Sequence, residues 1–234
     1  MDTSENDTLP LVYEDDDLLV INKPSGLLSI QDGYHPEYPH LTRILEPQFG
    51  EIWLVHRLDK DTSGLILLAR NATTHRELNR AFRVREIKKI YHGLVTPIPE
   101  WREMDIQLPL LSNADRQHRT RVNVKHGKKA QSFCKITKWF DLGVLMEIQI
   151  LTGITHQIRA HLRAFNLSLL GDILYSAGLG PQPFQVQRTM LHARQIAFTH
   201  PMKHTWLELT APYPDDFRAA YEQLKTTTTR DVTI

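Results

Sequence analysis

Residues 56–64 (HRLDKDTSG) carry the densest set of reactive side chains in the sequence. They lie between two apolar runs, and loops held by rigid strands are where catalytic groups usually lie. Asp59, Asp61 and Ser63 match the opening half of an EF-hand calcium loop, but its twelfth position needs a bidentate Glu and is Arg70 here. Calcium binding is therefore not predicted. The structural alternative for the two aspartates is an Asx-turn followed by Gly64.

Other cofactor-binding patterns are also missing from the sequence. His156 and His161 are five residues apart, which misses the i, i+4 spacing that puts two zinc ligands on one helix face, and His200 with His204 has no third ligand nearby. The sequence contains no P-loop, no Gly-x-Gly-x-x-Gly unit between a strand and a helix, and no Gly-x-Ser-x-Gly elbow. We therefore expect no metal, no nucleotide cofactor and no serine-hydrolase chemistry.

The elements that must position this segment are mostly strands. Residues 11–13 and 18–21 flank an acidic turn and are predicted to pair as a hairpin. Residues 64–69 (GLILLA) form an apolar run with the length of a buried strand. Further strands are expected at residues 90–95, 119–124, 130–140, 144–151, 193–199 and 205–210.

Three helices are predicted among these strands. Asn71 is the expected cap of the first, which has Leu78 and Phe82 on one face and directs Arg76, Arg80 and Arg83 outward. Thr155 is the expected cap of the second, whose apolar side would carry Ile158, Leu162 and Phe165. Residues 214–224 form a short closing helix. Strands with interspersed helices, without regular βαβ alternation, indicate an α+β fold.

The charge of the chain is balanced in total and segregated along its length. The formal net charge is +1, but residues 1–20 hold seven of the 27 acids and no Lys or Arg, so the other 214 residues carry 28 bases against 20 acids. Residues 116–138 contain eight Lys or Arg and no acid. Such a run is typical either of a polyanion-binding surface or of solvated strand and helix faces, and charge alone does not decide between them.

The composition is that of a globular protein. The 234 residues are 41% hydrophobic, no apolar run has the roughly 20 residues of a membrane helix, and the acidic start is unlike a signal peptide. The lone Cys134 allows no intramolecular disulfide, which suits a reducing compartment. We expect a cytoplasmic protein that does not bind membranes.

Six colinear segments resemble the RluA-type RNA pseudouridine synthases. HRLDKDTSGLILLAR at residues 56–70 is similar to the signature of that family, in which the Asp after Arg-Leu is catalytic. The other segments are NKPSGL (22–27), KIY (89–91), LTGITHQIRAHL (151–162), LLGDILY (169–175) and RTMLHARQIAFTHP (188–201). The resemblance implies a mixed, mainly antiparallel sheet with flanking helices, in two lobes around a central RNA-binding cleft. It also implies isomerisation of uridine to pseudouridine in structured tRNA or ribosomal RNA, without a cofactor.

The resemblance also implies roles for individual residues. Asp59 is the expected nucleophile or base, and a stacked uracil must be extruded from the RNA before it reaches this group. Tyr91 is expected to pack against the extruded uracil. Arg159 lies in the first turn of its helix, where the dipole disfavours a cation, and by similarity Asp59 is the anion that compensates it.

The remaining expected site residues are assigned to substrate binding. Arg57 is expected to fill the gap left by the flipped base, Lys23 and Lys89 to lie near phosphates, and Leu170 to line the uracil pocket; ordinary core or surface roles are the alternatives. His56 is placed with them, and the basic run contributes Arg119, Arg121, Lys128 and Lys129.

Two positions depart from the family pattern. The family usually has Arg where this chain has Ile154, and the common Gly-His-Pro before the LLGD-like segment is Asn166-Leu167-Ser168 here. Both bear on substrate choice more than on catalysis.

The expected organisation is a disordered acidic tail at residues 1–10, one catalytic domain at residues 11–225 without an N-terminal S4-like domain, and a C-terminal tail at residues 226–234. We expect a monomer. The alternatives from other classes are a non-catalytic RNA-binding module on the same scaffold and a metal-dependent nuclease built on Asp59 and Asp61.

Overall fold

The computed structural model describes residues 9–227. Within them the chain forms four helices and thirteen strands. In chain order these are β1 (Leu11–Glu14), β2 (Leu18–Lys23), α1 (Leu41–Phe49), β3 (Trp53–Leu54), β4 (Ser63–Ala69), α2 (Ala72–Arg83), β5 (Lys88–Thr96), β6 (Glu103–Ile106), β7 (Leu110–Leu111), β8 (Arg121–Val122), β9 (Ser132–Phe140), β10 (Gly143–Ile150), α3 (Gln157–Ala164), β11 (Ser168–Leu169), β12 (Leu191–Thr199), β13 (Trp206–Thr210) and α4 (Asp215–Thr227). None of the described helices is long and apolar enough to cross a membrane.

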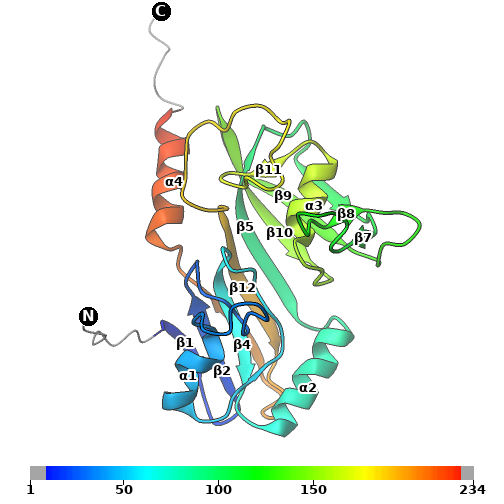
Figure 1. Cartoon of the computed structure of the whole chain (residues 1–234). Helices are drawn as coiled ribbons and strands as arrows, with labels where there is room; N and C mark the ends of the chain where they lie inside the picture. The colour runs from blue at the N-terminus through cyan, green and yellow to red at the C-terminus, as the bar shows by residue number, and fades with distance from the viewer. Residues whose placement is uncertain (1–8, 228–234) are drawn as a thin grey trace, which may run out of the picture.

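One large sheet organises the molecule. Its main path runs β1-β2-β4-β12-β5-β10-β9-β6, with β3, β11 and β13 paired at its sides and β7-β8 as a separate two-stranded ribbon. The pairs are antiparallel except for β4 with β12. The central strands β12 and β5 join the half that carries α1 and α2 to the half that carries α3 and α4 (Figure 1). The predicted α+β class, with a mixed and mainly antiparallel sheet, is confirmed.

The first half of the sheet is covered on both faces, which explains why β4 is an unbroken apolar run. All seven residues of β4 are buried. Leu65 and Leu67 pack in a cluster with Leu78 of α2, whereas Ile66 and Leu68 pack in a second cluster that includes Leu41 of α1. Because alternate residues of a strand point to opposite faces, a strand between two apolar layers needs apolar side chains at every position.

The acidic turn between β1 and β2 has a structural role. Asp15 accepts hydrogen bonds from the Tyr13 hydroxyl (2.7 Å), the Lys203 ammonium (2.6 Å) and the backbone N–H groups of Asp17 and Leu18. Burial opposes its charge, but these bonds, led by the one from Lys203, hold the pKa of Asp15 well below its usual range. Asp15, Asp17 and His200 form the one group of three candidate metal ligands in the described part of the chain. The Lys203 ammonium pairs with Asp15, and Asp17 accepts from the Asn71 side chain at 2.9 Å, so both carboxylates already have partners within the protein.

The local patterns that predicted the first two helices are confirmed in part. Asn71 caps α2, where its side chain accepts the backbone N–H of Thr74 at 2.9 Å. Thr155 is not the cap of α3: the helix starts one residue later, after His156, whose φ of 56° is left-handed and whose side chain makes no cap hydrogen bond. Phe165 is the C-cap of α3 and is 36% exposed, so its place on the apolar side was wrong.

Three further expectations need correction. The strand expected at residues 119–124 is shorter in the structure, where only Arg121–Val122 form β8. The helix α1 was not predicted; it has Pro47 in its interior, where proline usually breaks a helix. Of the tail at residues 1–10, Leu9 packs against the core and the Pro10 carbonyl accepts the N–H of Asn22, while residues 1–8 lie outside the described part. At the other end α4 continues to Thr227, and the rest of the tail at residues 226–234 lies outside the described part.

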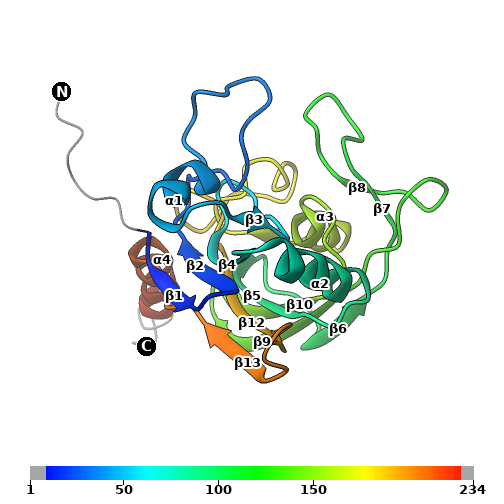
Figure 2. The same ribbon diagram turned by 90° about the horizontal axis from the view of Figure 1, so that it is seen from below.

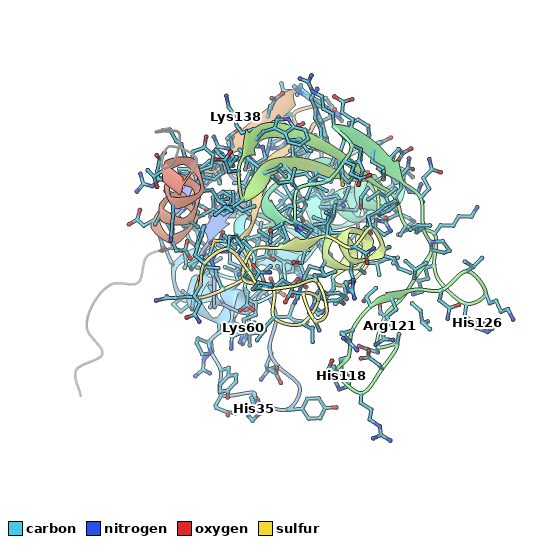
Figure 3. All side chains as sticks on the ribbon, turned by 90° about the horizontal axis from the view of Figure 1, so that it is seen from above. His35, Lys60, His118, Arg121, His126 and Lys138 are labelled. Carbon is cyan, nitrogen blue, oxygen red and sulfur yellow. The ribbon has the colours of Figure 1, made fainter. Side chains whose placement is uncertain are left out.

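Two long loops extend from the same side of the molecule. One joins β2 to α1 and the other joins β7 to β8, and Figure 2 shows them projecting together past α3 and α1. In Figure 3, His35 marks the first loop and His118 the second, and Lys60 lies on the side of the molecule from which both extend. Because Lys60 follows Asp59 in the chain, the reactive segment lies on the side to which both loops extend.

Candidate active site

Donors from other parts of the chain hold the segment around Asp59 by hydrogen bonds to its backbone carbonyl groups. The Lys60 carbonyl accepts from the N–H of Gly26 (2.9 Å) and from the Lys23 ammonium (3.2 Å). The Asp61 carbonyl accepts from the Ser25 hydroxyl (2.9 Å) and from a guanidinium N–H of Arg188 (3.1 Å). These four donors fix the loop through its carbonyl groups and leave the Asp59 side chain free to face the cleft.

A glycine lets this loop enter the sheet. Gly64 has a φ of +111°, and a Cβ placed on it would lie 2.3 Å from the Ala193 carbonyl oxygen of β12. Ser63 and Gly64 pair with His192 and Ala193, so the two parallel strands approach each other directly after the reactive loop. Only a residue without a side chain allows both this backbone angle and this approach.

The Asp59 side chain lines a cavity of about 1030 Å³ between α2, α3 and the central strands. Its walls come from residues 55–62, from α2, from β5 and from residues 150–159. The Asp59 side chain is 26% exposed. The cavity also contains Arg57, Lys89, Lys128 and Lys129. A carboxylate in a cavity of this size, surrounded by cations, is suited to a polyanionic ligand that places one reacting group beside the carboxylate.

Tyr91 reaches the cavity from the middle of β5. It is 7% exposed and lines the same cavity as Asp59. Burial, and then the negative charge of Asp59, raise the pKa of the Tyr91 hydroxyl above its usual range. Tyr91 is therefore a neutral phenol at physiological pH, able to present its ring and an O–H group to a ligand.

Arg159 is paired with an acid that the sequence analysis did not assign. Its Nε and Nη2 donate to the two carboxylate oxygens of Asp172 at 2.7 and 2.8 Å. The expected partner, Asp59, forms no ion pair or hydrogen bond with it, so that expectation is corrected: Asp172 is the compensating anion. Burial opposes the charge of Arg159, but Asp172, through its hydrogen bonds and charge, raises the pKa of Arg159, with a smaller contribution from Asp59.

His156 is a residue of this site that sequence reasoning missed. Its Nε2 lies 4.0 Å from Oδ2 of Asp59, and both side chains line the cavity. The signal was available, because His156 belongs to the THQIR segment that also supplies Arg159. Asp172 was likewise inside a quoted segment, LLGDILY, without an assigned role.

The expected substrate-binding residues divide into two groups. Arg57, Lys89, Lys128 and Lys129 line the cavity, and burial lowers the pKa of Lys89 to about 8. His56 also lines it, but its Nε2 accepts the N–H of Leu67 at 2.9 Å, and burial lowers its pKa to about 3, so it is neutral.

Four expected residues lie elsewhere. Lys23 is fully buried, and its ammonium donates to the carbonyls of Pro24, Leu27 and Lys60, so it does not lie where phosphates could reach it. Leu170 is 1% exposed and packs with the α4 cluster away from the cavity. Arg119 and Arg121 both pair with Asp115, at 2.7 and 2.8 Å, and line a smaller second cavity. Asp115 was left out of the sequence analysis because it lies one position before the acid-free run at residues 116–138.

The two departures from the family pattern also have positions in the structure. Ile154 lines the main cavity, and its backbone N–H donates to Oε1 of Gln157 at 3.2 Å. Ser168 is buried at the start of β11, beside the turn that follows α3. The first departure therefore changes the surface of the cavity, whereas the second runs from the exposed Asn166 to the buried Leu167 and Ser168.

Comparisons with known proteins agree on one family. The model of the RNA pseudouridylate synthase family matches residues 17–164. The dual-specificity RNA pseudouridine synthase RluA of Pasteurella multocida (strain Pm70) is 38% identical, over 87% of this chain and 93% of that protein. The ribosomal large subunit pseudouridine synthase C of Buchnera aphidicola subsp. Baizongia pistaciae (strain Bp) is 34% identical, over 92% of this chain and 70% of that protein. The solved structure of human RNA pseudouridylate synthase domain containing 4 has a TM-score of 0.76 at 25% identity, over 92% of this chain and 93% of that chain.

Proposed function

As the chain belongs to the RNA pseudouridylate synthase family, and so isomerises uridine in RNA, we propose that Asp59 is the residue that starts the reaction. The observation that carries this proposal is the position of its carboxylate, in a cavity lined by cations and beside the buried Tyr91. The family membership also weighs against the non-catalytic alternative, because the relatives carry enzyme names.

The isomerisation needs no outside atoms or electrons. The bond between uracil N1 and ribose C1′ breaks, a bond between uracil C5 and C1′ forms, one proton leaves C5 and one is taken up at N1. Asp59 acts either as the nucleophile or as the base that starts cleavage of the first bond. Tyr91 packs against the uracil, so that the detached ring stays in the cavity while it turns. A neutral Tyr91 presents no charge to the ring during this step.

The target uridine has to leave its stack to reach Asp59. We propose that it is extruded into the cavity, at a cost of a few kcal/mol for unstacking. Arg57 is exposed and lines the cavity, which supports the proposal that it occupies the gap in the RNA. Lys89, Lys128 and Lys129 hold the neighbouring phosphates, which offsets part of that cost.

The proposed substrates are ribosomal RNA and tRNA. One relative is named as a ribosomal large-subunit enzyme, which supports ribosomal RNA, and another as a dual-specificity RNA enzyme, which supports a second class of RNA, here proposed to be tRNA. We propose that the enzyme works in the cytoplasm, as a monomer without a metal or cofactor. Mapping pseudouridine in total RNA with and without the gene would identify the target.

The test compares two aspartates of one loop. Total RNA from cells that lack the gene is incubated with the parent, with Asp59→Asn and with Asp61→Asn, and pseudouridine is measured. We expect Asp59→Asn to form none and Asp61→Asn to remain active, because the loop uses Asp61 through its carbonyl group. Equal activity of Asp59→Asn and the parent would disprove the role of Asp59. Inhibition by EDTA would instead favour the nuclease alternative.

A further inference from the structure

His156 has a backbone conformation that does not serve the helix it precedes. A helix N-cap usually has extended φ and ψ angles and a side chain that accepts a backbone N–H. His156 has φ 56° and ψ 22°, and its side chain makes no cap hydrogen bond. A left-handed angle at a residue other than glycine costs about 1–3 kcal/mol and persists where the surroundings enforce it. The angle turns the imidazole of His156 into the Asp59 cavity.

A hydrogen-bond chain fixes the protonation of this imidazole. The Tyr175 hydroxyl accepts the backbone N–H of Thr120 at 2.7 Å and lies 3.2 Å from Nδ1 of His156. The Tyr175 hydroxyl has a single hydrogen, and this hydrogen finds an acceptor when the hydroxyl donates to Nδ1 of His156. In the neutral ring the proton is then on Nε2, the nitrogen that faces Asp59 at 4.0 Å.

The surroundings favour the neutral ring. Burial, with smaller contributions from Arg159 and Arg57, lowers the pKa of His156, while Asp59 and Asp172 oppose this shift. The imidazole therefore presents an uncharged N–H group toward the Asp59 carboxylate. The gap of 4.0 Å is longer than a hydrogen bond, and hydrogen bonds in catalytic sites often tighten only when the substrate is bound.

We propose that His156 is a positioning residue, whose Nε2–H donates to Oδ2 of Asp59 when RNA closes the site and so directs the other carboxylate oxygen at the target nucleotide. This inference rests on the proposed role of Asp59. Tyr175 serves the same purpose indirectly, because it keeps the proton of His156 on the correct nitrogen. Its ring also stacks on the Arg159 guanidinium at 4.8 Å, which joins His156, Arg159 and Tyr175 in one assembly.

Two amide substitutions separate positioning from a structural role. The Gln amide nitrogen is as many bonds from Cβ as Nε2 of histidine, whereas the Asn amide nitrogen matches Nδ1. Asn accepts a left-handed backbone more readily than other residues, so His156→Asn satisfies the fold best. A positioning role predicts that His156→Gln retains kcat within about threefold, and that His156→Asn and His156→Phe lose about 10- to 100-fold in kcat with KM changed less than about twofold.

Tyr175→Phe supplies an independent measurement. It leaves Nδ1 without its donor, so we expect kcat to fall in the parent and to fall no further in the His156→Phe background. Steady-state kcat and KM on one RNA substrate, with Asp59→Asn in the same series, test both proposals. Activity of Asp59→Asn would overturn the proposed function. An inactive Asp59→Asn together with parental kcat in His156→Phe, or with better activity in His156→Asn than in His156→Gln, would overturn the role of His156 alone.

Discussion

The substitution Asp172→Asn tests the ion pair between Arg159 and Asp172, which the structure shows in place of the expected pair between Arg159 and Asp59. The Asp172 side chain is 0% exposed and that of Arg159 is 11% exposed, so water solvates neither charge well. Asn at position 172 keeps an oxygen for the N–H groups of Leu174 and Tyr175, which Oδ1 accepts at 3.1 Å, but it removes the charge that Arg159 faces. The substitution is therefore a nearly isosteric removal of one member of a buried pair.

Breaking a buried ion pair from one side destabilises a protein by about 3–5 kcal/mol, because the other charge stays buried without compensation. This is a large share of the roughly 5–15 kcal/mol by which domains are stable. Asp59→Asn is the matched control. The Asp59 side chain is 26% exposed, and its Oδ2 lies 4.0 Å from Nε2 of His156, so we expect a change in the free energy of unfolding below about 0.5 kcal/mol.

Urea unfolding followed by circular dichroism measures both variants. Equal slopes with urea concentration are required, so that a shift in midpoint reports stability alone. Our reasoning predicts a large fall for Asp172→Asn and almost none for Asp59→Asn. A larger loss for Asp59→Asn would mean that Arg159 pairs with Asp59 after all, and the corrected assignment would be wrong.

Two further predictions concern buried lysines. Burial, and then the charge of Arg188, lower the pKa of Lys23 to about 7 from 10.5, so above pH 7 the unfolded chain binds more protons at this group than the folded chain and stability should rise with pH. In urea unfolding we expect the parent to gain stability relative to Lys23→Met between pH 7 and pH 9.5. A constant difference between the two proteins would contradict the lowered pKa. Lys89 has a pKa of about 8, so above that pH it should lose its charge and its attraction for phosphate. RNA affinity is measured by fluorescence anisotropy at constant ionic strength. It should fall from pH 7 to pH 9.5 in the parent and in Lys88→Met, a control at an exposed site, and fall much less in Lys89→Met.

Local patterns predicted those parts of the fold in which neighbours in sequence decide the structure. The hairpin of β1 and β2, the buried strand β4 and the Asn71 cap of α2 depend on turn residues, an apolar run and a short polar side chain, all visible within a few positions. The helix α1 was missed because its Pro47 contradicts helix propensity, and the packing of Leu41 and Leu45 in the core overrides that preference.

The candidate site was predicted in its residues more completely than in its pairings. The segments at residues 56–70, 89–91 and 151–162 identified Asp59, Tyr91 and Arg159, and the structure brings all three to one cavity. The partner of Arg159 could not be read from spacing, since Asp172 is 13 residues away and reaches it only when β11 docks on β5. Lys23 shows the same limit, because nothing in the sequence near the end of β2 indicates that the lysine is buried and donates to three carbonyl groups.

The anchoring of the Asp59 loop by Arg188 has a consequence for when the enzyme becomes active during its synthesis. The bond from Arg188 to the Asp61 carbonyl spans 127 positions of the chain, and the Ser63–His192 contact spans 129. Arg188 is itself held by Asp216, in the first turn of α4. Contacts this distant in sequence form late, because the loop between them must close first. A nascent chain that already carries Asp59, Tyr91 and Arg159 therefore still lacks Arg188, one of the four donors that hold its reactive loop. We therefore expect the reactive loop to gain its last anchor only after α4 has left the ribosome, which would delay the action of a half-made chain on the RNA around it.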